Sequence, residues 1–279
     1  MIHRRSRHAT VLQYAALFGF IVFLSFPLLW MLSTSFKGPR ELVALTASLI
    51  PVAPTLENYG TAFGEQDLVQ SAANSIQLSL GNAILTVLVA LPAAYGLARY
   101  ATILRKATMG WILVSQIFPL ILIIIPLFLV LKTLHLLDSL SGLLIVYLVW
   151  SLPFTLWMLQ TYVKAIPLEL EEAASIDGAG RLRILRAIVL PLLAPGIVVA
   201  ALFAFISAWN EFFFALVLLQ SPDLSTLPLT LARFVGAEGK VALGPLAAGA
   251  FLATLPGLFV FSLLQRRLTS GLLAGAVKG

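Results

Sequence analysis

Long apolar runs separated by short polar segments make up most of this chain. Six runs reach the length of about 20 mainly apolar residues that a membrane-spanning helix needs. Within them apolar and polar residues do not alternate, so the strands of a membrane barrel are not indicated. Because helices satisfy their own backbone hydrogen bonds in lipid, we expect an all-α integral membrane protein forming one domain over residues 1–279. The expected spans are roughly 11–36, 71–98, 108–131, 140–163, 187–219 and 244–264.

Composition supports a membrane protein and excludes several kinds of site. The chain is 60% hydrophobic and only 11% charged, which is too little charge for the polar surface of a soluble domain. It contains no cysteine and three histidines, so disulfides and thiol chemistry are excluded and a histidine metal cluster is not expected. The first apolar run continues from Val11 to Phe36, longer than the core of a signal peptide, and we interpret it as a retained helix.

Lysine and arginine are distributed unevenly between the two sides of the expected membrane. With the N-terminus inside, thirteen of the eighteen basic residues lie in inner segments and the other five in outer ones. This bias predicts that both termini are cytoplasmic. It also explains the net charge of +6 without nucleic acid as a partner. The five outer residues are Lys37, Arg40, Lys132, Arg233 and Lys240.

The longest inner loop, residues 166–191, carries the densest charge of the chain. Acidic residues follow Pro167, where they complement the dipole at the start of a helix. Gly178 is suited to the left-handed conformation that ends a helix, and a second short helix with three arginines leads into the fifth span. One interpretation is a loop whose arginines bind anionic lipid headgroups. The small pair Ala173-Ala174 and the acids favour the other, a helix that docks on another protein.

At this loop the sequence resembles a known family. Glu172-Ala173-Ala174, then Gly178, then "IVLP" at 188–191 is similar to the EAA loop of permease subunits of binding-protein-dependent ABC importers. The stretches "AAYGLARY", "AWNEFFFAL" and "QRRLTSGLLAGAVKG" resemble the MalG-like branch that serves carbohydrates. The resemblance implies the type I importer permease fold, with this loop as the coupling helix on an ATP-binding subunit. The residues it assigns to that contact are Glu172, Ala173, Ala174, Asp177, Gly178, Arg181 and Pro191.

The resemblance also implies a set of partners. These are a second, MalF-like permease, two ATP-binding subunits, an extracytoplasmic solute-binding protein and a sugar. The chain has no GxxxxGK[ST] motif to hold ATP phosphates, so no cofactor is expected here, and ATP with Mg²⁺ would be bound by the partners. The tail 266–279 is expected to reach the ATP-binding subunits, with contacts at Gly275, Val277, Lys278 and Gly279. The expected location is the bacterial inner membrane.

Polar residues inside the spans are candidates for the solute path. Glu211 is the only acid within a span, where ionisable groups are costly and tend to face a cavity or a partner. Asn210, Trp209 and the mid-span Gln116 are further candidates, although Glu211 also fits an interfacial carboxylate beside an aromatic belt. Asn74, Gln77 and Asn82 are expected to form interhelical hydrogen bonds, and Gln116 fits that role as well.

Two other classes of membrane protein fit the sequence less well. An ion-coupled secondary transporter would need intramembrane charges as coupling sites, and only Glu211 is available. A membrane enzyme would need a nucleophile–base pair or a metal set, which the His and Asp positions do not supply.

The outer segment 220–243 has turn signals at Ser221-Pro222 and Gly236, and we expect it to contact the solute-binding protein.

Overall fold

The computed structural model describes residues 7–65, 67–100, 103–236 and 241–276. Side chains are described throughout these ranges except at 7–9, 65, 103–105, 109, 113, 116 and 264–276. The described residues are mostly helical, and the extended pairing among them is an isolated antiparallel bridge between Val235 and Val241. The chain forms two compact units, each treated on its own: Met1–Leu68 with Thr230–Leu255, and Val69–Leu229 with Pro256–Gly279.

Five of the expected spans are found as helical runs long and apolar enough to cross a membrane. The all-α expectation is therefore confirmed for the described part of the chain. These runs are Thr10–Ser35 in α1 (Arg7–Ser35), α4 (Leu68–Arg99), α7 (Leu140–Ala165), Arg181–Trp209, and Leu243–Leu263 in α13 (Leu243–Ala276).

The expected third span, 108–131, is divided between two helices. Helix α5 (Ile103–Ile117) ends before Pro119, which has extended backbone angles, and α6 (Leu120–Thr133) begins directly after it. A proline disfavours helical geometry in the residue before it and has no N–H to continue the hydrogen-bond ladder. At about 1.5 Å per residue, α6 alone is about 21 Å long, short of a bilayer core. This segment therefore does not form one continuous spanning helix.

The expected fifth span, 187–219, begins earlier and ends sooner than the apolar pattern indicates. Helix α9 (Arg181–Ile184) passes through a π-helical segment, η1 (Leu185–Val189), into α10 (Leu190–Trp209). Pro191 cannot donate the usual backbone hydrogen bond, and a wider turn before it relieves the clash of its ring with the preceding turn. The chain then leaves the helix and resumes it as α11 (Phe213–Leu218).

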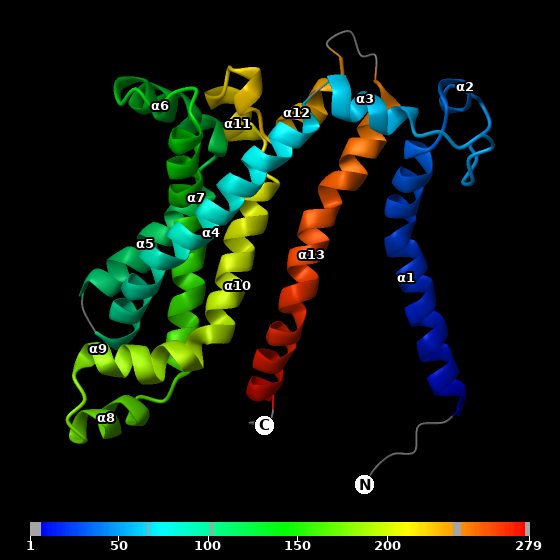
Figure 1. The fold of residues 1–279 in the computed structure, drawn as a ribbon. Coiled ribbons are helices and arrows are strands. Elements are labelled where there is room, and N and C mark those ends of the chain that lie inside the picture. Colours follow the sequence, from blue (N-terminus) through cyan, green and yellow to red (C-terminus); the bar gives the residue numbers. More distant parts are fainter. Residues whose placement is uncertain (1–6, 66, 101–102, 237–240, 277–279) are drawn as a thin grey trace. The chain divides into compact units, whose positions relative to one another are not determined.

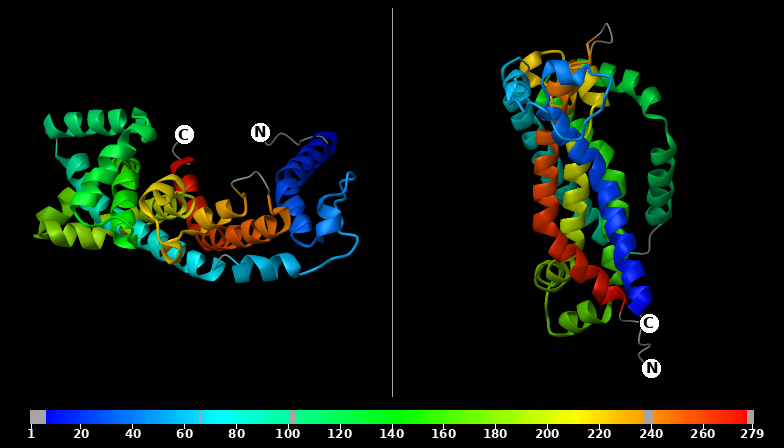
Figure 2. Two further views of the ribbon diagram at one scale, coloured as in Figure 1. Left: turned by 90° about the horizontal axis from the view of Figure 1, so that it is seen from above. Right: turned by 90° about the vertical axis from the view of Figure 1, so that its right-hand side faces the viewer.

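Helices α7 and α10 lie side by side in the second unit (Figures 1 and 2). Their close approach depends on Gly196, where an added Cβ would lie 2.7 Å from the Tyr162 ring. Asn82 of α4 joins both helices, since its side-chain amide donates to the Ser151 hydroxyl (2.9 Å) and to the Ala204 carbonyl (2.8 Å). The expected interhelical role of Asn82 is confirmed.

The side chains of Asn74 and Gln77 do not bond another spanning helix in the way that Asn82 does. Asn74 donates to the carbonyls of Asp223 (2.8 Å) and Ser225 (3.0 Å), so it fixes the loop after α11 rather than another spanning helix. Gln77 is exposed. That loop, part of the outer segment 220–243, contains a 3-10 turn, η2 (Pro222–Leu224), and α12 (Leu227–Arg233).

The first unit contains a fixed loop after α1. Two short helices, α2 (Pro39–Leu42) and α3 (Glu57–Glu65), lie within it. The buried Lys37 donates to the Ser48 carbonyl and lies 4.6 Å from the centre of the Trp30 ring. Asn58 donates to the carbonyls of Ser35 (2.9 Å) and Lys37 (2.8 Å). These contacts hold the segment after α1 in one conformation.

In the second unit, Asp138 fastens the turn before α7 to the loop after α11. Its carboxylate accepts hydrogen bonds from the Ser221 hydroxyl (2.5 Å) and from the N–H groups of Ser221 (2.9 Å) and Gln220 (2.8 Å). These bonds, the Ser221 hydroxyl first, hold the pKa of the Asp138 carboxyl below its usual value. The ionised form is therefore the one that the fold favours.

This attachment predicts a pH-dependent contribution to stability. Because the folded-state pKa of Asp138 is lowered, the stabilisation is present above the unfolded value of about 3.9 and is lost as the pH falls through the folded-state value. Asp138→Asn removes the charge but keeps a residue that tolerates the left-handed φ of 50°. We expect the variant to unfold at a lower temperature than wild type at pH 7, with the difference closing towards pH 3. A difference that does not change with pH would contradict this.

Candidate functional site: the 166–191 loop

Helix α8 (Glu169–Ile176) follows Pro167, and its first turn contains three acids. It ends at the expected glycine corner. Gly178 has φ of +80°, its N–H donates to the Ser175 carbonyl (3.1 Å), and the Ala179 N–H donates back to the Ala174 carbonyl (2.9 Å). The left-handed glycine predicted from the sequence is confirmed. The chain then turns into α9, whose helical path continues to Trp209 at the far end of α10.

The two faces of α8 differ in chemistry. Glu172, Ala173 and Ile176 are exposed, and Ile176 keeps 87% of its surface accessible. Ala174 is half-buried and packs against an apolar cluster that includes Val163, Ile184 and Val189. The two alanines, which the sequence analysis took together as favouring a docking helix, therefore differ in their surroundings. Ala173 is available to a partner, whereas Ala174 seats the helix on the protein.

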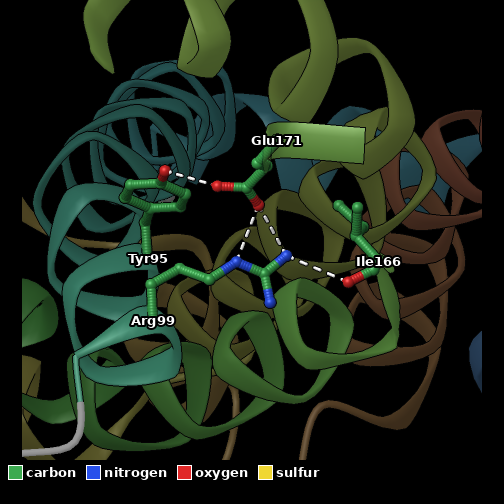
Figure 3. Close-up of polar contacts among 4 residues, drawn as sticks. All are labelled: Tyr95, Arg99, Ile166 and Glu171. Carbon is green, nitrogen blue, oxygen red and sulfur yellow. Dashed lines mark hydrogen bonds and ion pairs between the residues drawn. The ribbon is translucent and has the colours of Figure 1, made fainter. Parts of the chain in front are cut away.

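Glu171, which the sequence analysis did not single out, is buried on the inner face of α8 (Figure 3). One carboxylate oxygen accepts a hydrogen bond from Arg99 Nε (2.7 Å) and forms an ion pair with Arg99 Nη2 (2.7 Å). The other oxygen accepts from the Tyr95 hydroxyl at 2.7 Å. Arg99 also donates to the Ile166 carbonyl at the end of α7 (3.0 Å). One carboxylate thus joins α8 to α4, and Arg99 extends the contact to α7.

The arginines of α9 and η1 face outward. Arg181, Arg183 and Arg186 are exposed and line an open groove of about 710 Å³ with Gly180, Leu182 and Ala187. The Arg181 guanidinium lies 5.8 Å from the centre of the Tyr100 ring, a cation–π contact. The exposed Asp177 is at the C-cap of α8, and Pro191 is exposed in the first turn of α10. The loop therefore presents an acidic helix followed by a basic one.

Glu211 lies in the break between α10 and α11. Its carboxylate accepts from the N–H groups of Phe214 (2.8 Å) and Ala215 (3.2 Å) in the first turn of α11, and from the Tyr147 hydroxyl of α7 (2.9 Å). The two bonds to backbone N–H groups offer the chain an alternative to continuing α10. The half-buried side chain thus caps a helix, a role that its position inside an apolar run did not suggest.

The other predicted path residues have different surroundings. Trp209 is buried and stacks on Phe205 with ring centres 6.0 Å apart. Asn210 is exposed, and its amide donates back to the Ile206 carbonyl (3.0 Å). Gln116 lies in α5, but its side chain is outside the described residues. In the tail, Gly275 is in the last turn of α13, whereas Val277, Lys278 and Gly279 lie outside the described residues.

The sequence contains part of the information needed to predict the contact of Glu171 with Tyr95 and Arg99. Tyr95 and Arg99 are four residues apart, so they share one face at the end of α4. Glu171 and Glu172 are adjacent and must face different directions on a helix. The identity of the partners depends on the tertiary packing of α4 against the loop, which no local pattern contains.

Within the described ranges, no three His, Asp or Glu side chains gather to hold a metal ion.

Comparisons with known proteins agree on one family. A family model described as "Binding-protein-dependent transport system inner membrane component" matches residues 86–273. The chain is 60% identical over 229 residues to a protein of Streptomyces antibioticus named as an ABC transporter permease, covering 82% of this chain and 100% of that one. It is 38% identical to the sulfoquinovosyl glycerol transport system permease protein SmoH of Agrobacterium fabrum, covering 91% of this chain and 89% of that one.

A permease of a trehalose transport system and a solved transporter structure are also similar to this chain. The trehalose transport system permease protein SugB of Mycobacterium tuberculosis is 36% identical, covering 91% of this chain and 92% of that one. In fold, the chain is similar to one in the crystal structure of a bacterial ABC transporter that imports the acidic polysaccharide alginate. The TM-score is 0.79 at 24% identity, covering 95% of this chain and 98% of that one.

Proposed function

The chain belongs to the family of binding-protein-dependent transport system inner membrane components, and on that premise we propose that it is the permease subunit of an ATP-driven carbohydrate importer. It has the ABC importer permease fold, expected from the sequence as type I. The observation that carries the proposal is the exposed outer face of α8, anchored underneath and followed by helix from Arg181 to Trp209. A partner bound to this face would act directly on a spanning helix.

A carbohydrate is the proposed class of substrate. The relatives SmoH and SugB are named for the transport of sulfoquinovosyl glycerol and trehalose, and each alignment covers more than nine-tenths of this chain. We propose that Asn210, exposed at the end of α10, lines the solute path. Glu211 and Trp209 would hold that region in place as cap and buried support. Gln116 remains a second candidate for the path.

We further propose the assembly and its cycle. One of two ATP-binding subunits, which would hold ATP and Mg²⁺, would seat the outer face of α8 and the corner after it through Glu172, Ala173, Asp177, Gly178 and Arg181, with Pro191 in the first turn of the driven helix. A second, MalF-like permease would complete the path, and a solute-binding protein would dock on the outer segment 220–243. ATP binding would draw the coupling helices together and open the path outward, and hydrolysis would reset it. The tail 266–279 would contact the ATP-binding subunits.

Orientation follows from the same proposal. The permease would lie in the bacterial cytoplasmic membrane with both termini and the 166–191 loop inside. The loop arginines then match the excess of basic residues on that side. Headgroup binding by Arg183 and Arg186 remains compatible with docking, because these residues of α9 and η1 lie outside the proposed contact.

Uptake by the reconstituted complex tests this function. In proteoliposomes holding both permeases, the ATP-binding subunits and the binding protein, we expect uptake of a labelled disaccharide to require ATP and to persist when ionophores remove ion gradients. Glu211→Gln should leave the ATP requirement unchanged. The rival, an ion-coupled transporter using Glu211, predicts uptake that follows an ion gradient without ATP and is lost in this variant, and that result would overturn the proposal.

A further inference from the structure

We propose that Glu171 is a positioning residue for transport, fastening α8 to the end of α4 so that a displacement of α8 moves α4 with it. This inference rests on the proposed function, because it concerns how movement at the α8 face enters the membrane. The chain itself provides one route, from the glycine corner through the helical run Arg181–Trp209. The geometry points to a second route through Arg99 and Tyr95.

The contact is a complete and buried polar site. Both oxygens of Glu171 are engaged, one by Arg99 and the other by Tyr95, with all three distances between these polar atoms at 2.7 Å (Figure 3). The side chains of Arg99 and Glu171 are only 11% and 8% exposed. Charge-assisted hydrogen bonds of this length are among the strong ones in proteins. Removing either charge would leave the other buried without its partner, which is strongly unfavourable.

The remaining attachments of α8 are weaker or more flexible. Its eight residues pack mainly on α9 and η1, where Ala174 contributes a single methyl group. One end joins α7 through an extended Ile166, and the other turns at Gly178. Neither connection resists rotation of α8 as a buried ion pair does. The Glu171 contact therefore determines whether α8 and α4 move together.

Helix α4 can carry such a movement into the membrane. Tyr95 and Arg99 occupy one face of its last turns, and Asn82 on the same helix bonds α7 at Ser151 and α10 at Ala204. Pro92 lies between these two attachments, and a proline is a point where a helix bends more readily. The segment fastened to α8 is thus the short piece beyond Pro92. We infer that this piece follows α8 during each cycle.

The test measures disaccharide molecules imported per ATP hydrolysed, which a purely structural contact would not change in an assembled complex. Glu171→Gln keeps the shape of the side chain and removes its charge, and Glu169→Gln is the matched control on an exposed acid of the same turn. We expect ATP hydrolysis to continue in Glu171→Gln while import per ATP falls roughly tenfold, within the range of coupling losses. The control should match wild type.

Restoring the link covalently separates attachment from charge. The chain has no cysteine of its own, so a Glu171→Cys, Arg99→Cys pair can be bridged by a short bifunctional maleimide. We expect import per ATP to be low before bridging and to recover after it. The proposal is overturned by unchanged import per ATP in Glu171→Gln, by loss of complex assembly in that variant, or by efficient bridging without recovery. If wild type itself shows no ATP-driven import, the proposed function fails instead.

Discussion

Glu172→Lys will abolish ATP-driven import while the permease still inserts and folds. Glu172 is exposed on the outer face of α8, so the folding of the permease subunit does not depend on this carboxylate. If this face docks on a partner, however, the new lysine would face partner groups that are arranged to suit a negative carboxylate. Truncating one member of a buried charge pair at an interface costs about 2–5 kcal/mol. We therefore expect import in proteoliposomes to fall at least about thirtyfold.

A matched reversal on the same helix provides the control. Glu169→Lys alters an exposed acid in the first turn of α8, outside the residues assigned to the contact. We expect it to keep most of the import activity. Normal import by Glu172→Lys in a fully assembled complex would show that the α8 face does not dock as proposed. Equal losses in both variants would indicate a general charge effect instead.

Gly178→Ala will uncouple the loop, whereas Gly180→Ala will not. A Cβ added at either glycine meets no atom within 4 Å, so crowding within the chain does not distinguish them. Their backbone conformations distinguish the two glycines, since Gly178 has φ of +80° and Gly180 has φ of −69°. An L-residue in the left-handed region costs about 1–2 kcal/mol. The alanine at 178 would relieve this strain by turning α8 away from its direction relative to α9.

Import and unfolding temperature of the two variants are the measurements. We expect Gly178→Ala to lose import several-fold, consistent with a shift of about 1–2 kcal/mol, and Gly180→Ala to match wild type in both. Gly178→Asn should fall between them, because asparagine tolerates the left-handed region better than other residues with a Cβ. Equal import by the two alanine variants would contradict a role for the corner in setting the direction of α8.

The spans and the loop could be predicted because their signals are local. Apolar length alone located five spanning runs, and the acids after Pro167 with Gly178 located α8 and its end. The break at Pro119 was also present in the sequence, but apolar length hid it. Prolines occur inside α1, α4, α6, α7, α10 and α13 without ending them. Whether a proline interrupts a helix depends on its surroundings.

Two features could not be predicted because they depend on tertiary contacts. Glu211 looked like a lone acid in a helix, and the bond it accepts from the Tyr147 hydroxyl depends on α7 lying alongside it. Glu171 looked like one of three equivalent acids, and only the packing of α4 beneath the loop distinguishes it. Ala174 shows the same limit, since the motif gives the residue but not the direction it faces.

Site-specific crosslinking tests the central claim, docking of the outer face of α8 on an ATP-binding subunit, most directly. The chain has no cysteine, so single substitutions report on one position of this subunit. Ile176→Cys is on the outer face, and Val43→Cys is a control of similar exposure, 82%, in the segment after α1 that we expect on the opposite side of the membrane. We predict that a short bifunctional reagent links position 176, and not position 43, to an ATP-binding subunit in the assembled complex. No link from 176, or a link from 43, would contradict the account.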